Sequence, residues 1–183
     1  MPRTARLSRD DWAAAALHAL TEGGVSAVAV EPVAARLGAS KSSFYWLFED
    51  RRALLEAALE RWERVQTEQV ITLLAGIADP AERLRFLIRH AFAAPASADL
   101  ALRLLTESGE PAVRAAAERV TRRRLDVMAE TFAEMGLPRE QARHHAAASY
   151  AIYLGTAALH RVDAAPDDVE AYVASITKAL VPA

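Results

Sequence analysis

Five polar and aromatic side chains in one short stretch of the sequence could together hold an anionic polymer. They are Lys41, Ser42, Ser43, Tyr45 and Trp46. Ammonium, hydroxyl and phenol groups donate hydrogen bonds to phosphate oxygens, and side chains on one helix can reach base edges in the major groove of DNA. The stretch therefore indicates a surface that contacts something polar and anionic.

A helix must precede these residues, since apolar side chains recur there with helical spacing. Val30, Val33, Ala34 and Leu37 lie at i, i+3, i+4 and i+7, which places them on one face of a helix. Gly38 follows, and glycine closes helices because it adopts the left-handed conformation at no steric cost. We therefore expect this first helix to end at the glycine.

A second helix carries the five side chains. Ser40 can cap its start through the hydroxyl, and Phe44 and Phe48 are four residues apart, so both rings face inward. The whole helix–turn–helix spans Ala29 to Phe48. A plainer interpretation stands beside this one, because two helices joined by a glycine turn occur in many all-α proteins.

Further helix signals flank the pair. Ser8–Asp11 fits a capping box that opens an earlier helix, and Asp50 can cap a long helix that follows. Arg51 stands at the start of that long helix, and Arg3 and Arg6 lie on a short N-terminal arm. The pair is therefore expected within a three-helix unit that has basic residues near its ends.

Residues 8–55 resemble the DNA-binding domain of the TetR family of bacterial transcriptional regulators. The family pattern is roughly A..LG.SK.S.Y.HF..K..LL, and this chain reads AARLGASKSSFYWLFEDRRALL. The resemblance covers about a quarter of the chain, and its spacing is specific. The matching residues are Leu20, Gly23, Val33, Ala34, Leu37, Gly38, Ser40, Lys41, Tyr45, Phe48, Leu54 and Leu55.

Three departures from the family pattern change what the resemblance implies. Leu47 stands where the family often has His, so a phosphate contact from that position is missing, while Arg51 replaces the usual Lys and keeps the charge. Ala29 replaces a common Thr or Ser, so the first helix of the motif lacks its side-chain cap. The residues that the resemblance then implies at DNA are Lys41, Ser42, Ser43, Tyr45, Trp46 and Arg51, with Arg3 and Arg6 as further candidates.

The remaining helix signals predict an all-α protein. We expect a DNA-binding domain of residues 1–52 and a C-terminal domain of residues 53–183 for effector binding and dimerisation. The resemblance implies about nine helices, three of them in the first domain. The long helix is expected to run from Asp50 to about Leu74, and later helices are expected near residues 79–95, 97–107, 111–135, 138–162 and 167–180.

The helix Pro138–Val162 is rich in Ala and apolar on more than one face, so it needs two neighbours. One neighbour can lie in its own subunit and the other in a second copy, and the resemblance implies a four-helix dimer bundle built with the last helix. The alternative is the central helix of a monomeric bundle. The expected interface residues are Tyr150, Leu154, Ala158, Val169, Tyr172 and Ile176.

An effector pocket in the C-terminal domain is implied by the resemblance, and the sequence offers only candidates for its lining. Each candidate is a large or polar side chain on an otherwise apolar helix face, and each by itself is more typical of a plain core residue. As a set they would suit a small, partly aromatic ligand with one polar or anionic group. They are Trp62, Phe86, His90, Arg103, Met128, Tyr150 and Tyr153.

The composition of the chain and the motifs that it lacks narrow the classes of protein and the kinds of chemistry to be expected. The chain has 183 residues and no cysteine, so disulfides and thiol chemistry are absent. Its net charge is −2, so a single DNA-binding domain would bind DNA weakly. It has no long uncharged apolar run and no apolar stretch near its start, so we expect no membrane span, no signal peptide and a cytoplasmic location. No catalytic motif or metal-ligand spacing is present, which predicts no enzyme activity, no cofactor and no bound metal.

The sequence thus predicts a ligand-responsive regulator, a repressor that binds a palindromic DNA operator as a homodimer and is released by a small-molecule effector. Two alternatives stay open. The first is an all-α protein that binds a small molecule or a partner but no longer binds DNA. Leu47 and the low net charge keep this alternative open, because both weaken the prediction of DNA binding. The second is an all-α enzyme, which lacks any catalytic constellation.

Overall fold

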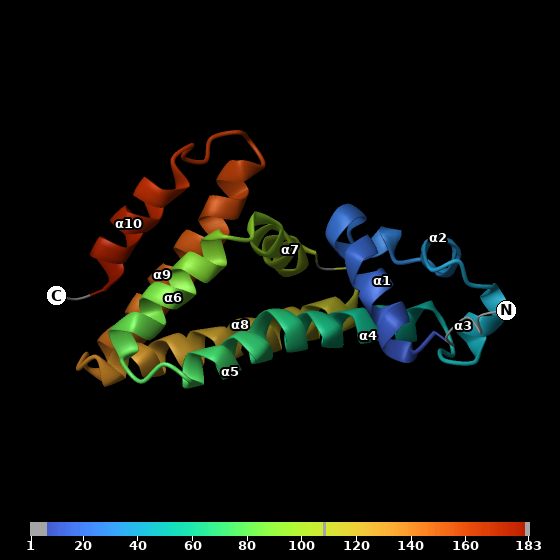
Figure 1. The fold of residues 1–183 in the computed structure, drawn as a ribbon, viewed down its shortest axis with the longest axis horizontal. Helices are drawn as coiled ribbons and strands as arrows, with labels where there is room; N and C mark the ends of the chain where they lie inside the picture. Colours follow the sequence, from blue (N-terminus) through green and yellow to red (C-terminus); the bar gives the residue numbers. More distant parts are fainter. Residues whose placement is uncertain (1–6, 108, 182–183) are drawn as a thin grey trace, which may run out of the picture. The chain divides into compact units, whose positions relative to one another are not determined.

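The computed structural model describes residues 7–107 and 109–181, and this part of the chain contains helices and no strands (Figure 1). The contacts divide the chain into two compact units, Met1–Val65 and Gln66–Ala183. If α4 and α5 are counted as one helix, the described residues form nine helices besides a short 3-10 turn. The predicted all-α class and helix number are therefore confirmed.

The first unit begins with α1 (Arg9–Gly23), whose start is held by the predicted capping box. The Asp11 backbone N–H donates to the Ser8 hydroxyl at 3.2 Å, and the Ser8 backbone N–H donates to the Asp11 carboxylate at 2.7 Å. The 3-10 turn η1 (Val25–Ala27), α2 (Val30–Arg36), α3 (Lys41–Tyr45) and α4 (Arg51–Glu63) follow. Asp50 caps α4 by accepting from the Ala53 N–H at 2.8 Å.

Aromatic side chains form the centre of the first unit. The ring of Trp12 lies 5.4 Å from that of Phe44 and 6.5 Å from that of Phe48, and the two phenylalanines stack 5.4 Å apart. All three side chains are buried. Because α3 is only one turn long, this cluster rather than helix propensity must fix its position.

The unit boundary lies beyond the expected domain border at residues 52 and 53. The helix α4 packs against α1, and its side chains Leu54, Leu55, Ala58 and Trp62 are buried. A border at residue 52 would separate these side chains from the core that they complete. The first unit therefore includes the whole of α4.

The long helix predicted to Leu74 is present but contains an irregular turn. After α4 the backbone forms a π-helical turn over Arg64–Glu68, here called the π-turn, and then continues as α5 (Gln69–Ala75). The helix ends at Gly76, as expected. The π-turn spans the boundary between the two units, and no sequence signal predicted it.

The second unit also contains α6 (Pro80–Phe92), α7 (Pro95–Thr106), α8 (Pro111–Glu134), α9 (Arg139–His160) and α10 (Val169–Leu180). Three of these helices start with proline, which suits the first helical position because its missing N–H is not needed there. Pro95 therefore opens α7 two residues before the expected start at Ser97.

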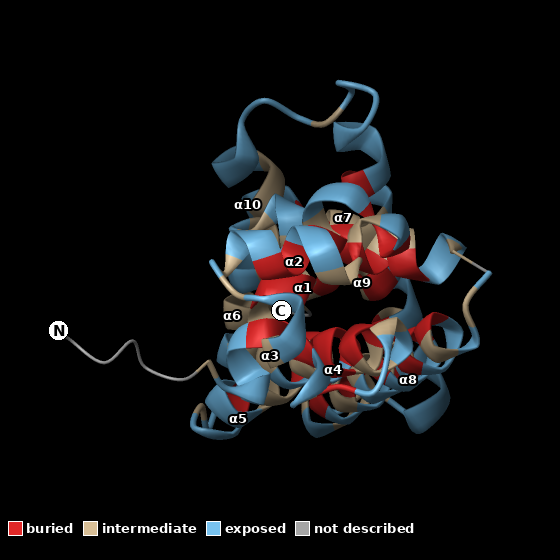
Figure 2. Ribbon diagram, turned by 90° about the vertical axis from the view of Figure 1, so that its right-hand side faces the viewer, coloured by how far each residue is buried: buried red, intermediate tan, exposed pale blue. Residues whose placement is uncertain are grey.

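The core of the second unit lies mainly between α8 and α9, which make the most extensive helix contact there. The helix α7 packs on both of them, and α10 packs against α6 (Figure 1). The core consists of Leu84, Ile88, Met128, Phe132, Ala142, Ala146, Tyr150, Ile176 and Leu180. The outward sides of α9 and α10 are largely exposed (Figure 2).

Across residues 7–107 and 109–181, no helix is both long and apolar enough to cross a lipid bilayer. The same residues contain no group of three or more His, Asp or Glu side chains arranged to hold a metal ion.

Candidate nucleic-acid interface

The turn between α2 and α3 has the geometry predicted for it. Gly38 has a φ of +61°, in the left-handed region, and the Ala39 N–H donates to the Ala34 carbonyl at 2.9 Å. Ser40 caps α3, since its hydroxyl accepts from the Ser43 N–H at 3.2 Å. Ala29 gives α2 no side-chain cap, as expected.

The outer face of the motif carries the polar and aromatic side chains that the sequence singled out. Tyr45 is 64% exposed and Trp46 is 79% exposed, the highest value among the large apolar side chains described as exposed. Lys41 and Ser42 are also exposed. Large aromatic side chains are rarely left this open without a binding partner, so this face is a candidate interface.

Ser43 differs from its neighbours because its hydroxyl is used inside the motif. It is half-buried and donates to the Ser40 carbonyl at 2.6 Å. Ser42 shares a hydrogen bond of 2.8 Å with the Ser40 hydroxyl but stays exposed. The structure therefore brings Ser42 to the open face and gives Ser43 a role in the start of α3.

Lys41 is paired with a carboxylate of the preceding helix. Its ammonium group contacts Glu31, and the hydrogen bond with Glu31 raises the pKa of Lys41 and lowers the pKa of Glu31. Both side chains are exposed, so the pair is weak and screened by salt. A phosphate that approaches Lys41 must compete with this carboxylate.

Arg51 does not lie among the exposed residues of the motif, contrary to the expected DNA contact. Its side chain is half-buried, its Nε donates to the Val28 carbonyl and its terminal nitrogen donates to the Val25 carbonyl, both at 2.7 Å. These bonds tie the start of α4 to the 3-10 turn that precedes α2. The arginine is therefore directed into the unit, where it satisfies backbone carbonyls.

Arg9 is a residue that the sequence analysis missed. Its guanidinium lies 4.6 Å from the centre of the Phe48 ring and donates to the Leu47 carbonyl at 3.2 Å. Arg9, at the start of α1, thus holds the end of the helix–turn–helix at Leu47 and Phe48. No local pattern identifies this long-range contact, and the expected arm residues Arg3 and Arg6 lie outside the described residues.

The residues expected to line an effector pocket are brought together only in part: the rings of Tyr150 and Tyr153 stack 5.9 Å apart beside Met128 in one core cluster, and the other members lie elsewhere. Trp62 is buried in the first unit, whereas Met128 and Tyr150 belong to the core of the second. On α6 the rings of Phe86 and His90 stack 5.8 Å apart, and His90 is exposed. Large side chains on apolar faces are usually core residues, and these largely follow that rule.

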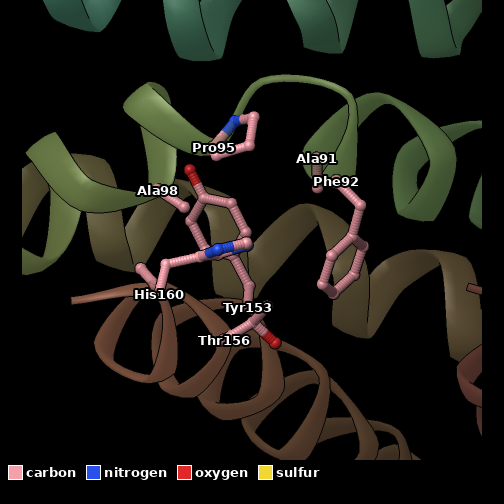
Figure 3. A pocket seen from close by; sticks show the side chains of 8 residues that line it. Ala91, Phe92, Pro95, Ala98, Tyr153, Thr156 and His160 are labelled. Carbon is pink, nitrogen blue, oxygen red and sulfur yellow. The ribbon is translucent and has the colours of Figure 1, made fainter. Parts of the chain in front are cut away.

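Two expected pocket residues have other surroundings. Arg103 pairs with Asp99 of the same helix at 3.2 Å, and Asp99 also accepts from Arg161 at 2.5 Å. Burial alone would raise the pKa of Asp99, but the hydrogen bonds with the two arginines outweigh it and lower the pKa. Tyr153 is the one member of the expected set that lines the pocket of Figure 3.

That pocket lies among α6, α7 and α9. Tyr153, Thr156 and His160 come from α9, Phe92 from α6 and Pro95 from α7 (Figure 3). It has room for about one water molecule. Burial raises the pKa of the Tyr153 phenol, which therefore stays neutral at physiological pH. The pocket is mostly apolar and carries a few hydroxyl and imidazole groups.

Three of the six expected dimer residues pack inside their own subunit instead. Tyr150 and Ile176 are 7% and 6% exposed and lie in the core. The Tyr172 ring meets Phe92 edge-on at 5.6 Å, and its hydroxyl lies 2.9 Å from that of Thr156. These three side chains are therefore used inside the subunit, whereas Leu154, Ala158 and Val169 remain at least partly exposed.

The exposed face of α9 is formed by small apolar residues. Leu154 is half-buried beside it, and Val169 of α10 is 44% exposed. Successive members are three or four residues apart, which gives a continuous stripe on one side of the helix. We call it the α9 stripe, and it consists of Ala147, Ala151, Gly155 and Ala158 of α9 with Val162 in the turn after the helix.

Comparisons with known proteins agree with this architecture. Residues 13–58 match the family model described as bacterial regulatory proteins, tetR family. No curated protein matches the chain. The matched segment covers α2 and α3 and reaches from α1 into α4.

Several solved structures share the fold over nearly the whole chain. A regulatory protein TetR from Rhodobacter sphaeroides is 23% identical, with a TM-score of 0.76 over 94% of this chain and 98% of that one. Escherichia coli NemR in its reduced form is 19% identical, with a TM-score of 0.78 over 96% and 98%. The regulator FadR from Bacillus subtilis in complex with stearoyl-CoA is 18% identical, with a TM-score of 0.72 over 95% and 98%.

Residues 13–58 are thus similar to the N-terminal segment of bacterial regulatory proteins of the tetR family, and the chain shares the fold of these solved regulators.

Proposed function

We propose that this protein is a transcriptional repressor that binds a palindromic DNA operator through α3. The observation that carries the proposal is the open face of the motif, where Lys41, Tyr45 and Trp46 lie exposed on a helix fixed by a buried aromatic cluster. A helix whose outer face offers an ammonium, a phenol and an indole suits the major groove and its flanking phosphates. We expect Tyr45 and Lys41 at phosphates and Trp46 near base edges.

The repressor is proposed to work as a homodimer. The chain as a whole is slightly acidic, so one head would make few net favourable contacts with a phosphate backbone. The α9 stripe offers a helix face of small residues on which a second copy could pack closely. Two-fold symmetry of such a dimer would then match the symmetry of a palindromic operator.

A small-molecule effector is proposed to bind in the second unit and release the operator. The site proposed for it begins at the pocket beside Tyr153, which must open to admit anything larger than water. The Bacillus subtilis FadR structure contains stearoyl-CoA, so a regulator of this fold can hold a ligand. We infer that the protein acts in the cytoplasm, where bacterial DNA lies.

Selection from a random DNA library tests the proposal. Purified full-length protein should enrich a palindrome whose half-sites are separated by about one helical turn or a multiple of it. The Tyr45→Phe and Lys41→Ala variants should fold normally and enrich it poorly. If the wild-type protein enriches no sequence, the rival interpretation as a ligand-binding or interaction protein without DNA binding is favoured.

A further inference from the structure

The π-turn is stabilised by a side chain from a distant helix. A π-helical turn has i→i+5 hydrogen bonds and is uncommon, so it needs support from its surroundings. Thr67 is the buried member of this turn, with 2% of its surface exposed. The Nε of Arg124, on α8, donates to the Thr67 hydroxyl oxygen at 3.0 Å.

The same arginine also binds the backbone of the turn. A terminal nitrogen of Arg124 donates to the Gln66 carbonyl at 3.0 Å. Two donors of one planar guanidinium therefore reach two successive residues, which fixes its orientation as a single donor would not. Hydrogen bonds from a charged donor are stronger than neutral ones, and this group is half-buried.

On its other side the guanidinium faces the wall of the pocket. The central carbon of Arg124 lies 6.0 Å from the centre of the Tyr153 ring. This distance is at the outer limit of a cation–π interaction. Arg124 thus contacts both a residue that lines the pocket and the turn that links the second unit to the first.

We propose that Arg124 couples the pocket to the π-turn: while the Tyr153 ring stays in the pocket wall, Arg124 holds the turn in its π-helical form. The inference rests on the proposed effector-responsive function and names the residue that transmits the response. In this proposal, a molecule larger than water that enters the pocket displaces the Tyr153 ring from the pocket wall. That movement removes the ring from the guanidinium and weakens its hold on Gln66 and Thr67.

The π-turn is a suitable element to receive such a signal. The π-turn holds one residue more per turn than an α-helix. If it converts into a regular α-helical turn, the residues before it rotate about the helix axis relative to the residues after it. A turn that can exist in two hydrogen-bonding registers responds to small changes in its support, whereas a regular helix does not. Arg124 acts here as a positioning residue and is not proposed to touch the effector or DNA.

A neighbouring ion pair supplies a matched control. Arg123 precedes Arg124 on α8 and pairs with Glu68 of the same turn, with its Nε 3.3 Å from the carboxylate. Both side chains of this pair are nearly half exposed, so it contributes little to stability. Arg123→Gln therefore removes the same charge from the same helix without removing the two bonds to Gln66 and Thr67.

Amide hydrogen exchange of the full-length protein without DNA tests the hold on the turn. Arg124→Gln should speed exchange of amides in residues 64–72 by about tenfold or more, because the turn opens more often. Thr67→Val keeps the shape of the side chain and removes one acceptor, so it should produce a smaller increase at the same amides. Arg123→Gln should leave them within about twofold of wild type. Equal effects of Arg124→Gln and Arg123→Gln would overturn the proposal.

The coupling to the pocket is tested with a variant and a small aromatic probe. Tyr153→Ala removes the ring and should speed exchange in the π-turn as Arg124→Gln does. Adding phenol, which has the shape of the group that the substitution removes, should restore slow exchange in Tyr153→Ala but not in the double variant Tyr153→Ala with Arg124→Gln. Wild-type exchange in Tyr153→Ala, or a phenol effect that survives loss of Arg124, would contradict the coupling.

These measurements separate the inference from the proposed function. Exchange at the π-turn requires no operator, so it reports on Arg124 even if the protein binds no DNA. Conversely, wild-type exchange in Arg124→Gln together with tight operator binding by the wild-type protein would overturn this inference and leave the repressor proposal intact.

Discussion

The Lys41 ammonium on α3 is held by the Glu31 carboxylate on α2, across the turn of the motif proposed to bind DNA. Glu31 therefore neutralises the one basic side chain at the start of the recognition helix. The hydrogen bond to Lys41 lowers the pKa of Glu31 below its ordinary value of 4.5, so the carboxylate stays ionised at physiological pH. The pair is lost as the pH falls through the lowered pKa of Glu31 or rises through the raised pKa of Lys41.

Glu31→Gln is expected to increase operator affinity, because Lys41 no longer has to leave a carboxylate before it reaches a phosphate. The gain should be about threefold to tenfold at low salt and should fade as salt screens the pair. Fluorescence anisotropy at several salt concentrations measures it. Glu22→Gln is the control, since it removes another exposed carboxylate that pairs with an arginine, Arg36; an equal gain there would assign the effect to net charge alone.

Gly38→Val is expected to weaken operator binding by at least about tenfold, since a branched side chain disfavours the left-handed conformation by roughly 1–2 kcal/mol per residue. No atom lies within 4 Å of the position that a Cβ would take, so the cost is conformational and not a clash. Gly38→Asn should retain most of the affinity, because asparagine tolerates this conformation. If the two variants bind alike, the conformation of the turn does not control the recognition helix.

Arg51→Gln tests the internal role that the structure gives this side chain. The variant should lower the free energy of unfolding of the first unit by about 2 kcal/mol, since it removes charged donors from two carbonyls. The salt dependence of operator binding should keep its slope. Lys41→Ala should show the reverse, with unchanged stability and a slope lower by about one, because it removes a cationic phosphate contact. A slope change in Arg51→Gln would return this residue to the set that contacts phosphate.

The sequence predicted those parts of the motif that depend on local geometry. The positive φ of Gly38 and the Ser40 cap follow from residues within one turn of each other, and the structure has both. The direction of Arg51 could not be predicted, because its partners Val25 and Val28 come from a distant turn.

The faces of α9 and α10 show a second limit of sequence reasoning. Periodicity indicates that apolar residues share a face, but on an Ala-rich helix with two such faces it does not indicate which one the subunit itself buries. The internal core takes Tyr150 and Ile176 together with the small residues Ala142 and Ala146, whereas Ala147 and Ala151 remain exposed. The choice of face therefore depends on the packing of neighbouring helices, which the pattern does not contain.

Ala158→Glu is expected to abolish the proposed dimer, because two like charges would meet near the symmetry axis without partners. Sedimentation equilibrium should show a dimer for wild type and a monomer for the variant, which should also lose operator binding. Ala115→Glu, at an exposed position of α8 away from the stripe, is the control and should stay dimeric. Ile176→Glu should unfold the second unit instead, since that side chain is buried. A dimeric Ala158→Glu would exclude the α9 stripe as the interface.

Salt dependence of operator binding tests the central claim most directly. Anisotropy of the selected palindrome, measured with full-length protein from about 50 to about 300 mM salt, should give a linear log–log plot with a slope of several units, because each phosphate contact contributes about −0.9. Binding to a scrambled duplex should be much weaker at every salt concentration. A slope near zero, or equal affinity for the palindrome and the scrambled duplex, would contradict the assignment of this chain as an operator-binding repressor.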